Sequence, residues 1–190
     1  MNDVDAIANK AEIALIGEKL VKHGTKAGKD PIYSDIWNVG INTALRISDL
    51  LALTMADVKD AATVTLIEQK TGKARTITLN AKARDIIARR VRDNPDHVYL
   101  FQSTGNRAKS AGKPISRETV ARKFKEIGEI LGVNLGTHSM RKTRGAAMYA
   151  DGVPVEVICK VLNHSTPAVT LRYIGIDRAT VAATYDDYVL

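Results

Sequence analysis

Residues 63–79 restrict the fold of this 190-residue chain more than any other segment. β-Branched and apolar residues alternate over positions 63–69 and again over 74–79, and the basic, glycine-containing run 70–73 separates them. This pattern is typical of a β-hairpin. Apolar residues on both sides of it recur at helical spacing. We therefore expect an α+β fold that is mainly helical, with a small antiparallel β-sheet packed on helices.

Helical periodicity covers most of the remaining sequence. Helices are expected over residues 4–21, 31–39, 44–53, 83–92, 116–131, 138–150, 154–162 and 167–173. Pro31 suits a first helical turn, residues 40–43 with Gly40 predict the end of that helix, and Ser116 is a good N-cap. A short strand at 98–101, a polar loop at 102–114 and a short helix within 177–183 complete the prediction. His23 falls in the polar connection after the first helix.

Positive charge is concentrated in the middle of the chain. The formal net charge is +7, but residues 70–125 contain 15 lysines and arginines against 4 acidic residues, a net charge of +11. The remainder carries −4. A basic segment within a mildly acidic chain favours a phosphate-bearing partner. Aromatic residues make up only 5% of the chain, too few for a platform that stacks single strands, so we expect double-stranded DNA.

The single cysteine, Cys159, excludes an intramolecular disulfide and favours a reducing compartment. It lies in an apolar run and is expected to be a buried helix residue. No apolar run reaches the length of a membrane span, and the polar N-terminus does not resemble a signal peptide. These features predict a cytoplasmic, DNA-associated protein without membrane contact.

Residues 136–173 contain the side chains that a phosphodiester-cleaving enzyme with a tyrosine nucleophile requires. His138 and Arg141 are three residues apart, and His164 and Tyr173 follow. Cleavage of a phosphodiester places negative charge on nonbridging oxygens, which fixed cationic donors stabilise. Guanidinium groups match phosphate geometry and do not deprotonate, so Arg141 and the earlier Arg46 are natural clamps.

Six candidate residues follow one another along the chain: Arg46 in ALRISDL, Lys70 in EQKTGK, His138 and Arg141 in THSMRKT, His164 in LNHS and Tyr173 in TLRY. This ordered set resembles the catalytic domain of the tyrosine recombinases, or phage integrase family. The resemblance covers nearly the whole chain. It implies that Tyr173 attacks phosphorus, that Lys70 protonates the leaving 5′ oxygen, and that His138 takes or shares the tyrosine proton. It also implies that His164 donates to a phosphate oxygen, and that neither a metal, another cofactor nor ATP is needed.

Several alternatives accompany these assignments. Lys73 rivals Lys70 as the acid, and Tyr185 and Tyr188 rival Tyr173 but lie beside acidic residues. Asp49 matches an acidic family position that orients its neighbours; the simpler interpretation is a surface ion pair between Arg46 and Asp49. A zinc site formed by the histidines and the cysteine fits no common ligand spacing.

The chain also departs from the family pattern. Ala44 and Asn163 stand where glycine is frequent, and asparagine tolerates the left-handed conformation that such a position implies. We expect one catalytic domain over residues 1–190, with residues 1–30 as an N-terminal helix and linker and residues 175–190 as a tail that contacts other protomers. Only about thirty residues precede the second helix, so no separate N-terminal DNA-binding domain is expected in this sequence. The resemblance leaves two interpretations open, a naturally small recombinase or a catalytic fragment.

The resemblance implies a site-specific DNA recombinase that acts as a tetramer on paired sites, with a free domain that is compatible with a monomer. Candidate DNA contacts are Lys73, Arg75, Ser116, Arg117, Arg122 and Lys123. One alternative is an enzyme like the type IB topoisomerases. Another is a non-catalytic regulator, because residues 153–174 also fit a helix-turn-helix pattern.

Overall fold

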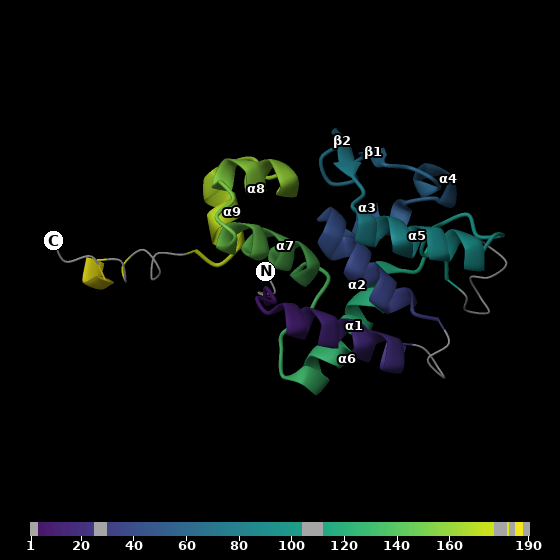
Figure 1. The fold of residues 1–190 in the computed structure, drawn as a ribbon, viewed down its shortest axis with the longest axis horizontal. Helices are drawn as coiled ribbons and strands as arrows, with labels where there is room; N and C mark the ends of the chain where they lie inside the picture. The colour runs from purple at the N-terminus through teal and green to yellow at the C-terminus, as the bar shows by residue number, and fades with distance from the viewer. Residues whose placement is uncertain (1–3, 25–29, 104–111, 177–181, 183–184, 188–190) are drawn as a thin grey trace.

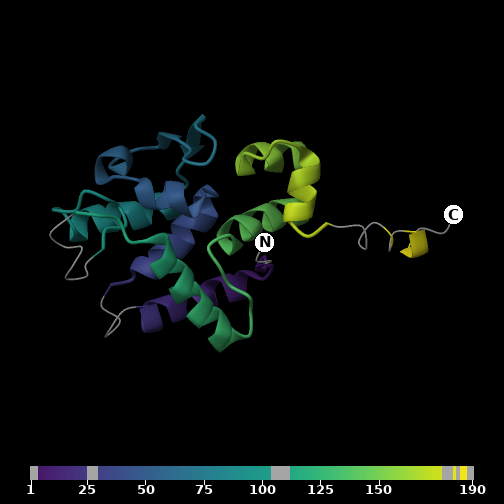
Figure 2. The same cartoon turned by 180° about the vertical axis from the view of Figure 1, so that it is seen from behind.

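The computed structural model describes residues 4–24, 30–103, 112–176, 182 and 185–187. Figures 1 and 2 show the described chain from opposite sides. Its elements are α1 (Lys10–Gly24), α2 (Ile32–Thr43), α3 (Ile47–Ala52), α4 (Met55–Val58), β1 (Thr63–Ile67), β2 (Ala74–Thr78), α5 (Ala81–Asp93), α6 (Arg117–Leu131), α7 (Ser139–Ala150), α8 (Val155–Leu162) and α9 (Pro167–Tyr173). The predicted mainly helical α+β fold with one small antiparallel sheet is confirmed.

Helix α2 occupies the centre of the core. It packs against α1, α5 and α7, and most of its residues are buried. Trp37 of α2 is fully buried, meets the Phe124 ring of α6 edge-on with centroids 5.7 Å apart, and donates from Nε1 to the Ile13 carbonyl at 3.1 Å. A helix that is apolar on nearly all sides belongs inside a domain. Helix α2 therefore fixes the elements that surround it.

The hairpin and the last three helices face each other across the loop that leads into α3. Figures 1 and 2 both show β1 and β2 opposite α8, with α7, α8 and α9 grouped at one end of the molecule. The strands pair antiparallel from Thr63↔Thr78 to Ile67↔Ala74, and Val64 and Ile77 turn inward. The predicted hairpin is thereby confirmed, and its turn is directed toward α8.

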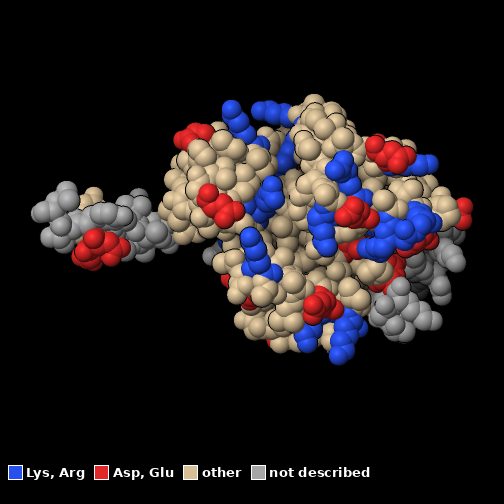
Figure 3. Space-filling view, viewed as in Figure 1, with Lys and Arg blue, Asp and Glu red and all other residues tan. Residues whose placement is uncertain are grey.

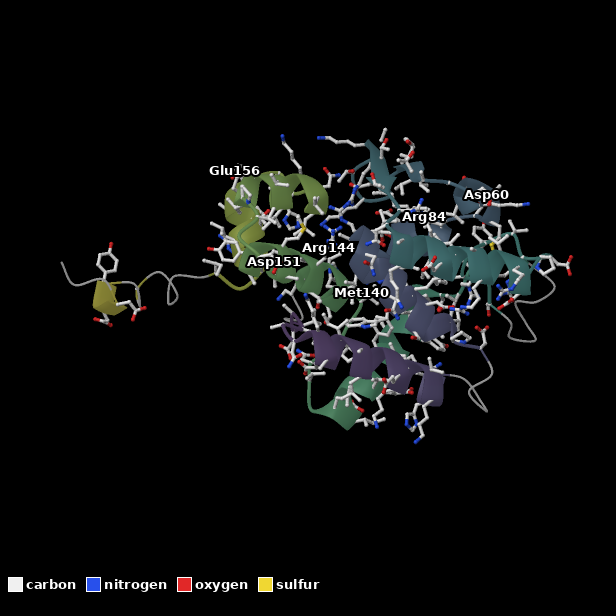
Figure 4. The ribbon with its side chains drawn as sticks, in the orientation of Figure 1. Asp60, Arg84, Met140, Arg144, Asp151 and Glu156 are labelled. Atoms are coloured by element: carbon white, nitrogen blue, oxygen red, sulfur yellow. The ribbon has the colours of Figure 1, made fainter. Side chains whose placement is uncertain are left out.

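The structure corrects the predicted end of α2. Gly40 does not end this helix, which continues to Thr43. A Cβ at Gly40 would lie 2.2 Å from Sδ of Met140, a residue of α7 that is labelled in Figure 4. Gly40 therefore permits close contact between two helices instead of breaking one. Pro31 is the N-cap of α2 and not its first residue.

Other boundaries differ where tertiary contacts compete with helical spacing. Helix α1 begins at Lys10 because the preceding chain is held elsewhere: the Asp5 amide donates to the Asn134 carbonyl, and the Ile7 amide to Thr143 Oγ1. His23 belongs to the last turn of α1 and is exposed. Residues 44–46 are not helical, and α3 starts at Ile47. The expected strand at 98–101 is reduced to an isolated bridge in which Tyr99 pairs with Thr54.

Predictions about helix starts and burial in the second half of the chain are confirmed. Ser116 caps α6 by accepting from the Thr119 amide at 3.2 Å, and Val120, Phe124 and Ile127 are buried. Cys159 is a buried residue of α8. Residues 104–111 of the predicted loop, and most of the predicted helix within 177–183, lie outside the described residues. In the described ranges, no helix combines the length and the apolarity needed to cross a membrane.

Candidate active site

Four elements bring most of the predicted catalytic side chains together. Arg46 is the N-cap of α3, His138 is the N-cap of α7, and Arg141 lies in the first turn of α7. His164 follows α8, and Tyr173 is the last residue of α9. Residues separated by more than 120 positions in sequence thus share one site.

Arg141 is fixed from inside the protein. It is 2% exposed, and its guanidinium donates to the carbonyl oxygens of Ala44 and Leu162. Ala44 is in the left-handed conformation, as is Asn163, the residue after Leu162. Burial, above all, lowers the pKa of Arg141. The two carbonyls use two of the five N–H donors of the guanidinium, so the remaining donors are available to the site.

Tyr173 lies beside a proton acceptor. Its hydroxyl oxygen is 3.3 Å from Nδ1 of His138 and 3.4 Å from the His138 carbonyl oxygen. Burial raises the pKa of Tyr173, and the charge and hydrogen bond of Arg141 act in the opposite direction. The resting phenol is therefore neutral at pH 7, and it would have to lose a proton in order to act as the predicted nucleophile. The Lys142 ammonium lies 5.9 Å from the centre of the Tyr173 ring.

His138 and His164 are both neutral at pH 7 in the free protein. Burial first, and then the charge of Arg141, lowers the pKa of His138 and lowers that of His164 to about 4. A neutral His138 can accept the phenol proton at Nδ1 when its other nitrogen carries hydrogen. Nδ1 of His164 lies 3.0 Å from Oγ1 of the buried Thr170, and the His164 ring meets the Tyr173 ring edge-on at 4.8 Å. Thr170 thus fixes the orientation of this imidazole.

Arg46 pairs with Glu68 and not with Asp49. Its Nη1 lies 2.7 Å from Oε2 of Glu68, so the alternative of an Arg46–Asp49 surface pair is wrong. Asp49 is buried and accepts from the Gln69 amide at 2.9 Å, which ties α3 to the hairpin. Burial alone raises the pKa of Glu68, but hydrogen bonds from Thr71 and Arg46 and the charge of Arg46 outweigh it, and the net shift is downward.

The hairpin turn carries two exposed lysines. Lys70 begins the turn and Lys73 ends it. The charge of Lys70 is among those that lower the pKa of His138 and of His164, after burial and the charge of Arg141. Lysine and arginine side chains lie at the rim between α8 and the hairpin, and others are set deeper between them (Figure 3). The choice between Lys70 and Lys73 as the acid stays a prediction.

The candidate DNA contacts fall into two groups. Lys73, Arg117 and Arg122 are exposed, Lys73 in the hairpin turn and the two arginines on α6, and the charge of Arg117 also acts on His138. Three others have partners within the protein: Arg75 pairs with Glu68 and donates to the Val161 carbonyl, Ser116 caps α6, and Lys123 pairs with Glu126. These partners do not test DNA binding, which stays a prediction for all of them.

Metal-binding groups, hollows and the remaining tyrosines bear on other possible ligand sites. The described part of the chain holds no group of three or more His, Cys, Asp or Glu side chains arranged to bind a metal ion. A hollow of about 440 Å³ lies between α4 and α5, where Asp60 and Arg84 are labelled in Figure 4, and none of the predicted catalytic residues lines it. Tyr185 is 80% exposed, and Tyr188 lies outside the described residues.

Two residues with contacts in the site were missed in the sequence. Glu68 continues the alternation of Val64 and Leu66, whose side chains point inward from β1. The pattern therefore indicated an inward-facing Glu68, but the sequence analysis assigned this residue no role. Thr170 faces His164 from one helical turn before Tyr173, and a threonine at that position carries no distinctive signal. Each contacts a group that the sequence had identified, Glu68 as the ion-pair partner of Arg46 and Thr170 as the hydrogen-bond partner of His164.

Comparisons with known proteins identify the family. Residues 19–179 match the family model described as the phage integrase family. The probable integrase/recombinase YoeC of Bacillus subtilis (strain 168) is 39% identical over 147 residues, which cover 77% of this chain and 78% of YoeC. The tyrosine recombinase XerA of Pyrococcus furiosus is 29% identical over 139 residues, 70% of this chain but 46% of XerA. The chain thus spans under half of that longer relative.

Solved structures share the fold. The crystal structure of XerA recombinase superposes with a TM-score of 0.71 at 18% identity, covering 98% of this chain and 65% of that one. A post-cleavage complex of the XerH site-specific recombinase with palindromic difH substrate superposes with a TM-score of 0.70 at 16% identity, covering 97% of this chain and 53% of that one. The architecture described above is therefore that of known recombinase domains.

Proposed function

This chain belongs to the phage integrase family of tyrosine recombinases and contains its catalytic domain, and on that premise we propose that it cuts and rejoins duplex DNA at specific sites through Tyr173. One observation carries the proposal: the Tyr173 hydroxyl lies 3.3 Å from Nδ1 of a neutral His138. With Arg141 hydrogen-bonded to the same phenol, nucleophile, base and phosphate clamp occupy one site.

In the proposed reaction the Tyr173 oxygen attacks phosphorus while its proton passes to His138. The bond from phosphorus to the 5′ oxygen breaks, and that oxygen takes a proton from Lys70. The products are a 3′-phosphotyrosyl link and a free 5′-hydroxyl. Because the link is itself a phosphodiester, attack by a 5′-hydroxyl reverses the reaction and needs no ATP.

Positive charge stabilises the pentacoordinate transition state. Arg46 and Arg141 supply two guanidinium groups for the nonbridging oxygens, and His164 donates a hydrogen bond to one of them. The two fixed cations meet the charge requirement of the reaction, so the proposal includes no metal ion. Paired recombination sites, a tetrameric assembly and contact through the tail beyond Tyr173 are further parts of the same proposal.

The decisive experiment traps the covalent intermediate. Duplexes are selected from a random-sequence pool by binding to the wild-type protein and are resynthesised with a nick at successive positions, so that a short fragment diffuses away after cleavage. We expect the wild type to form a denaturation-resistant protein–DNA adduct and Tyr173→Phe to form none while it binds the same duplex. Tyr185→Phe is the matched control and should form the adduct normally.

Each alternative has its own outcome. An adduct with Tyr173→Phe that disappears with Tyr185→Phe would move the nucleophile to the tail. Binding without any adduct at any nick position would favour the non-catalytic regulator. Relaxation of supercoiled plasmids that lack the selected sequence, without strand exchange between two selected sites, would favour an enzyme like the type IB topoisomerases.

A further inference from the structure

The Glu68 side chain connects the elements of the site although no catalytic role was expected for it. It directly follows β1 and is 0% exposed. Its Oε2 lies 2.7 Å from Arg46 Nη1 and accepts from Thr71 Oγ1 at 2.9 Å, and its Oε1 lies 3.2 Å from Arg75 Nη1. One carboxylate thus joins the start of α3, the hairpin turn and β2.

The same carboxylate also reaches the last three helices. Nδ2 of Asn163, the left-handed C-cap of α8, donates to Oε2 of Glu68 at 2.6 Å. Asn163 directly precedes His164 in sequence. Arg75 adds a parallel link, since it donates to the Val161 carbonyl in the last turn of α8. Glu68 therefore lies between Arg46 on one side and the His164 turn on the other.

The main chain of Glu68 closes the turn that carries Lys70. Its amide donates to the Lys73 carbonyl at 3.0 Å, and its carbonyl accepts from the Gly72 amide at 2.8 Å. The side-chain bond to Thr71 fixes the middle of the same turn. A displacement of Glu68 would consequently move the turn that carries Lys70.

A fully buried carboxylate is costly unless cations and hydrogen bonds compensate it. Glu68 has two guanidinium partners and two neutral donors, and its pKa is held below the ordinary value despite burial. Removal of its charge would leave Arg46 and Arg75 close together without a counter-charge. Such a set of contacts fixes geometry more than it adds stability, because buried ion pairs contribute little net free energy.

We propose that Glu68 is a positioning residue for the cleavage reaction, one that sets the Arg46 guanidinium, the Lys70 turn and the His164 turn relative to one another. Glu68 itself touches neither the nucleophile nor the scissile phosphate. The proposal rests on the proposed function for its catalytic consequence, whereas the coupling among the contacts can be measured without DNA cleavage.

The test compares Glu68→Gln with the wild type on three nicked duplexes. The first has a normal phosphodiester, the second a 5′-thio leaving group that needs little protonation, and the third a neutral methylphosphonate that makes less use of a cationic clamp. At saturating DNA we expect Glu68→Gln to cleave the normal duplex at least about tenfold more slowly, with a Kd within about threefold of wild type. Glu18→Gln, an exposed change on α1, is the matched control and should cleave normally.

Relief by the modified duplexes distinguishes positioning from general destabilisation. We expect the ratio of variant to wild-type rate to rise toward one on both the 5′-thio and the methylphosphonate duplex, because each bypasses one group that Glu68 holds. Thr71→Val removes only the contact in the turn and should be relieved by the 5′-thio duplex alone. An equal ratio on all three duplexes would overturn the proposal.

A second measurement separates this proposal from the proposed function. Urea unfolding of Glu68→Gln, Asn163→Ala and the double variant should give non-additive losses of stability, since one change weakens the contact between these two side chains and the other removes it. Additive losses would overturn the positioning role even if wild-type cleavage is normal. If the wild type forms no adduct while the losses are non-additive, the proposed function fails and the connecting role of Glu68 stands.

Discussion

At the residue scale, the site depends on two left-handed residues that are not glycine. Ala44 has φ 52° and Asn163 has φ 50°, and each lies within two residues of a predicted catalytic side chain, Arg46 and His164 respectively. The left-handed conformation costs an alanine about 1–2 kcal/mol, and asparagine less. The carbonyls that hold Arg141 belong to Ala44 itself and to Leu162, the residue before Asn163. The backbone strain thus accompanies the anchoring of Arg141, the proposed phosphate clamp.

Asn163 combines a backbone role with a side-chain role, and two substitutions separate them. Asn163→Gly keeps the left-handed turn but loses the bond to the Glu68 carboxylate, so unfolding free energy should fall by about 2 kcal/mol. Asn163→Ala adds left-handed strain and should lose about 1 kcal/mol more. Urea denaturation measures both values. If the two variants were equally stable, backbone conformation would contribute nothing at this position.

The pKa of His164 predicts how stability depends on pH. In the folded protein it is about 4, below the ordinary 6.5, so the folded state resists protonation that the unfolded chain accepts. The contribution of His164 is therefore complete above about pH 6.5 and is lost as pH falls toward 4; the lowered pKa of His138 acts in the same direction.

His164→Asn should consequently flatten this dependence. Between pH 7.5 and pH 5.0 we expect the variant to lose less unfolding free energy than the wild type, by on the order of 1 kcal/mol. Urea denaturation at the two pH values provides the measurement, and His23→Asn on the exposed end of α1 is the control. A loss in His164→Asn equal to that of the wild type would show that this imidazole does not resist protonation.

At the element scale, contact between α2 and α7 sets where Arg141 lies, and Gly40 permits that contact. A Cβ at this position would come 2.2 Å from Sδ and 3.0 Å from Cε of the buried Met140, one residue before Arg141. We expect Gly40→Ala to lose about 1–3 kcal/mol of unfolding free energy despite the higher helix propensity of alanine. Thermal or urea denaturation gives the value.

Gly17 on α1 supplies the control for this substitution. A Cβ there meets its nearest atoms, in Ser34 and Asn38, only at 3.5 Å, an ordinary contact. Gly17→Ala should thus be neutral or stabilising by up to about 1 kcal/mol. The double variant Gly40→Ala/Met140→Ala should lose less unfolding free energy than the sum of the losses in the two single variants. Strict additivity in that pair would place the strain elsewhere.

Gly40 also illustrates which parts of the fold the sequence could predict. Local periodicity identified the hairpin and most helices. Ser116 marked the start of α6 because a serine side chain is a good helix N-cap. The prediction that Gly40 ends α2 was wrong because a glycine is needed there for close contact with Met140, which is one hundred residues away in sequence. The proposed catalytic set could be selected from the sequence because its residue types are few and occur in a fixed order, and the structure brings most of its members together. Glu68 could not be selected in this way, because its importance depends on contacts with residues from four different segments of the chain.

At the scale of the whole molecule, the charge counted along the sequence is larger than the positive charge exposed on the surface that we propose for DNA. The segment from 70 to 125 carries +11, yet several of its cations are taken up inside the protein. Arg90 is 1% exposed and pairs with Asp35, which Arg89 also contacts, and Arg75 pairs with Glu68. Arg89 and Arg90 thus join α5 to α2, and Arg75 pairs within the hairpin and donates to the Val161 carbonyl of α8. The exposed cations of the hairpin turn and α6 have no such buried partner among the described contacts, and they are the ones that we propose for contact with phosphate.

This division predicts which substitutions change the salt dependence of DNA binding. Each lysine or arginine that neutralises a phosphate contributes about one to the slope of log Kd against log salt concentration. Arg117→Ala, which removes an exposed cation of α6, should reduce this slope by about 1. Lys123→Ala should change it little, because the ammonium pairs with Glu126 and donates to the His23 carbonyl.

The slope can be measured without a known site, by titrating a labelled duplex of mixed sequence at several salt concentrations. Lys22→Ala, an exposed change on α1 outside the basic segment, is the control and should leave the slope unchanged. If Lys123→Ala lowered the slope as much as Arg117→Ala, the ion pair with Glu126 would have to open on DNA. Sequence position within the basic segment, and not exposure in the free protein, would then decide which side chains contact phosphate.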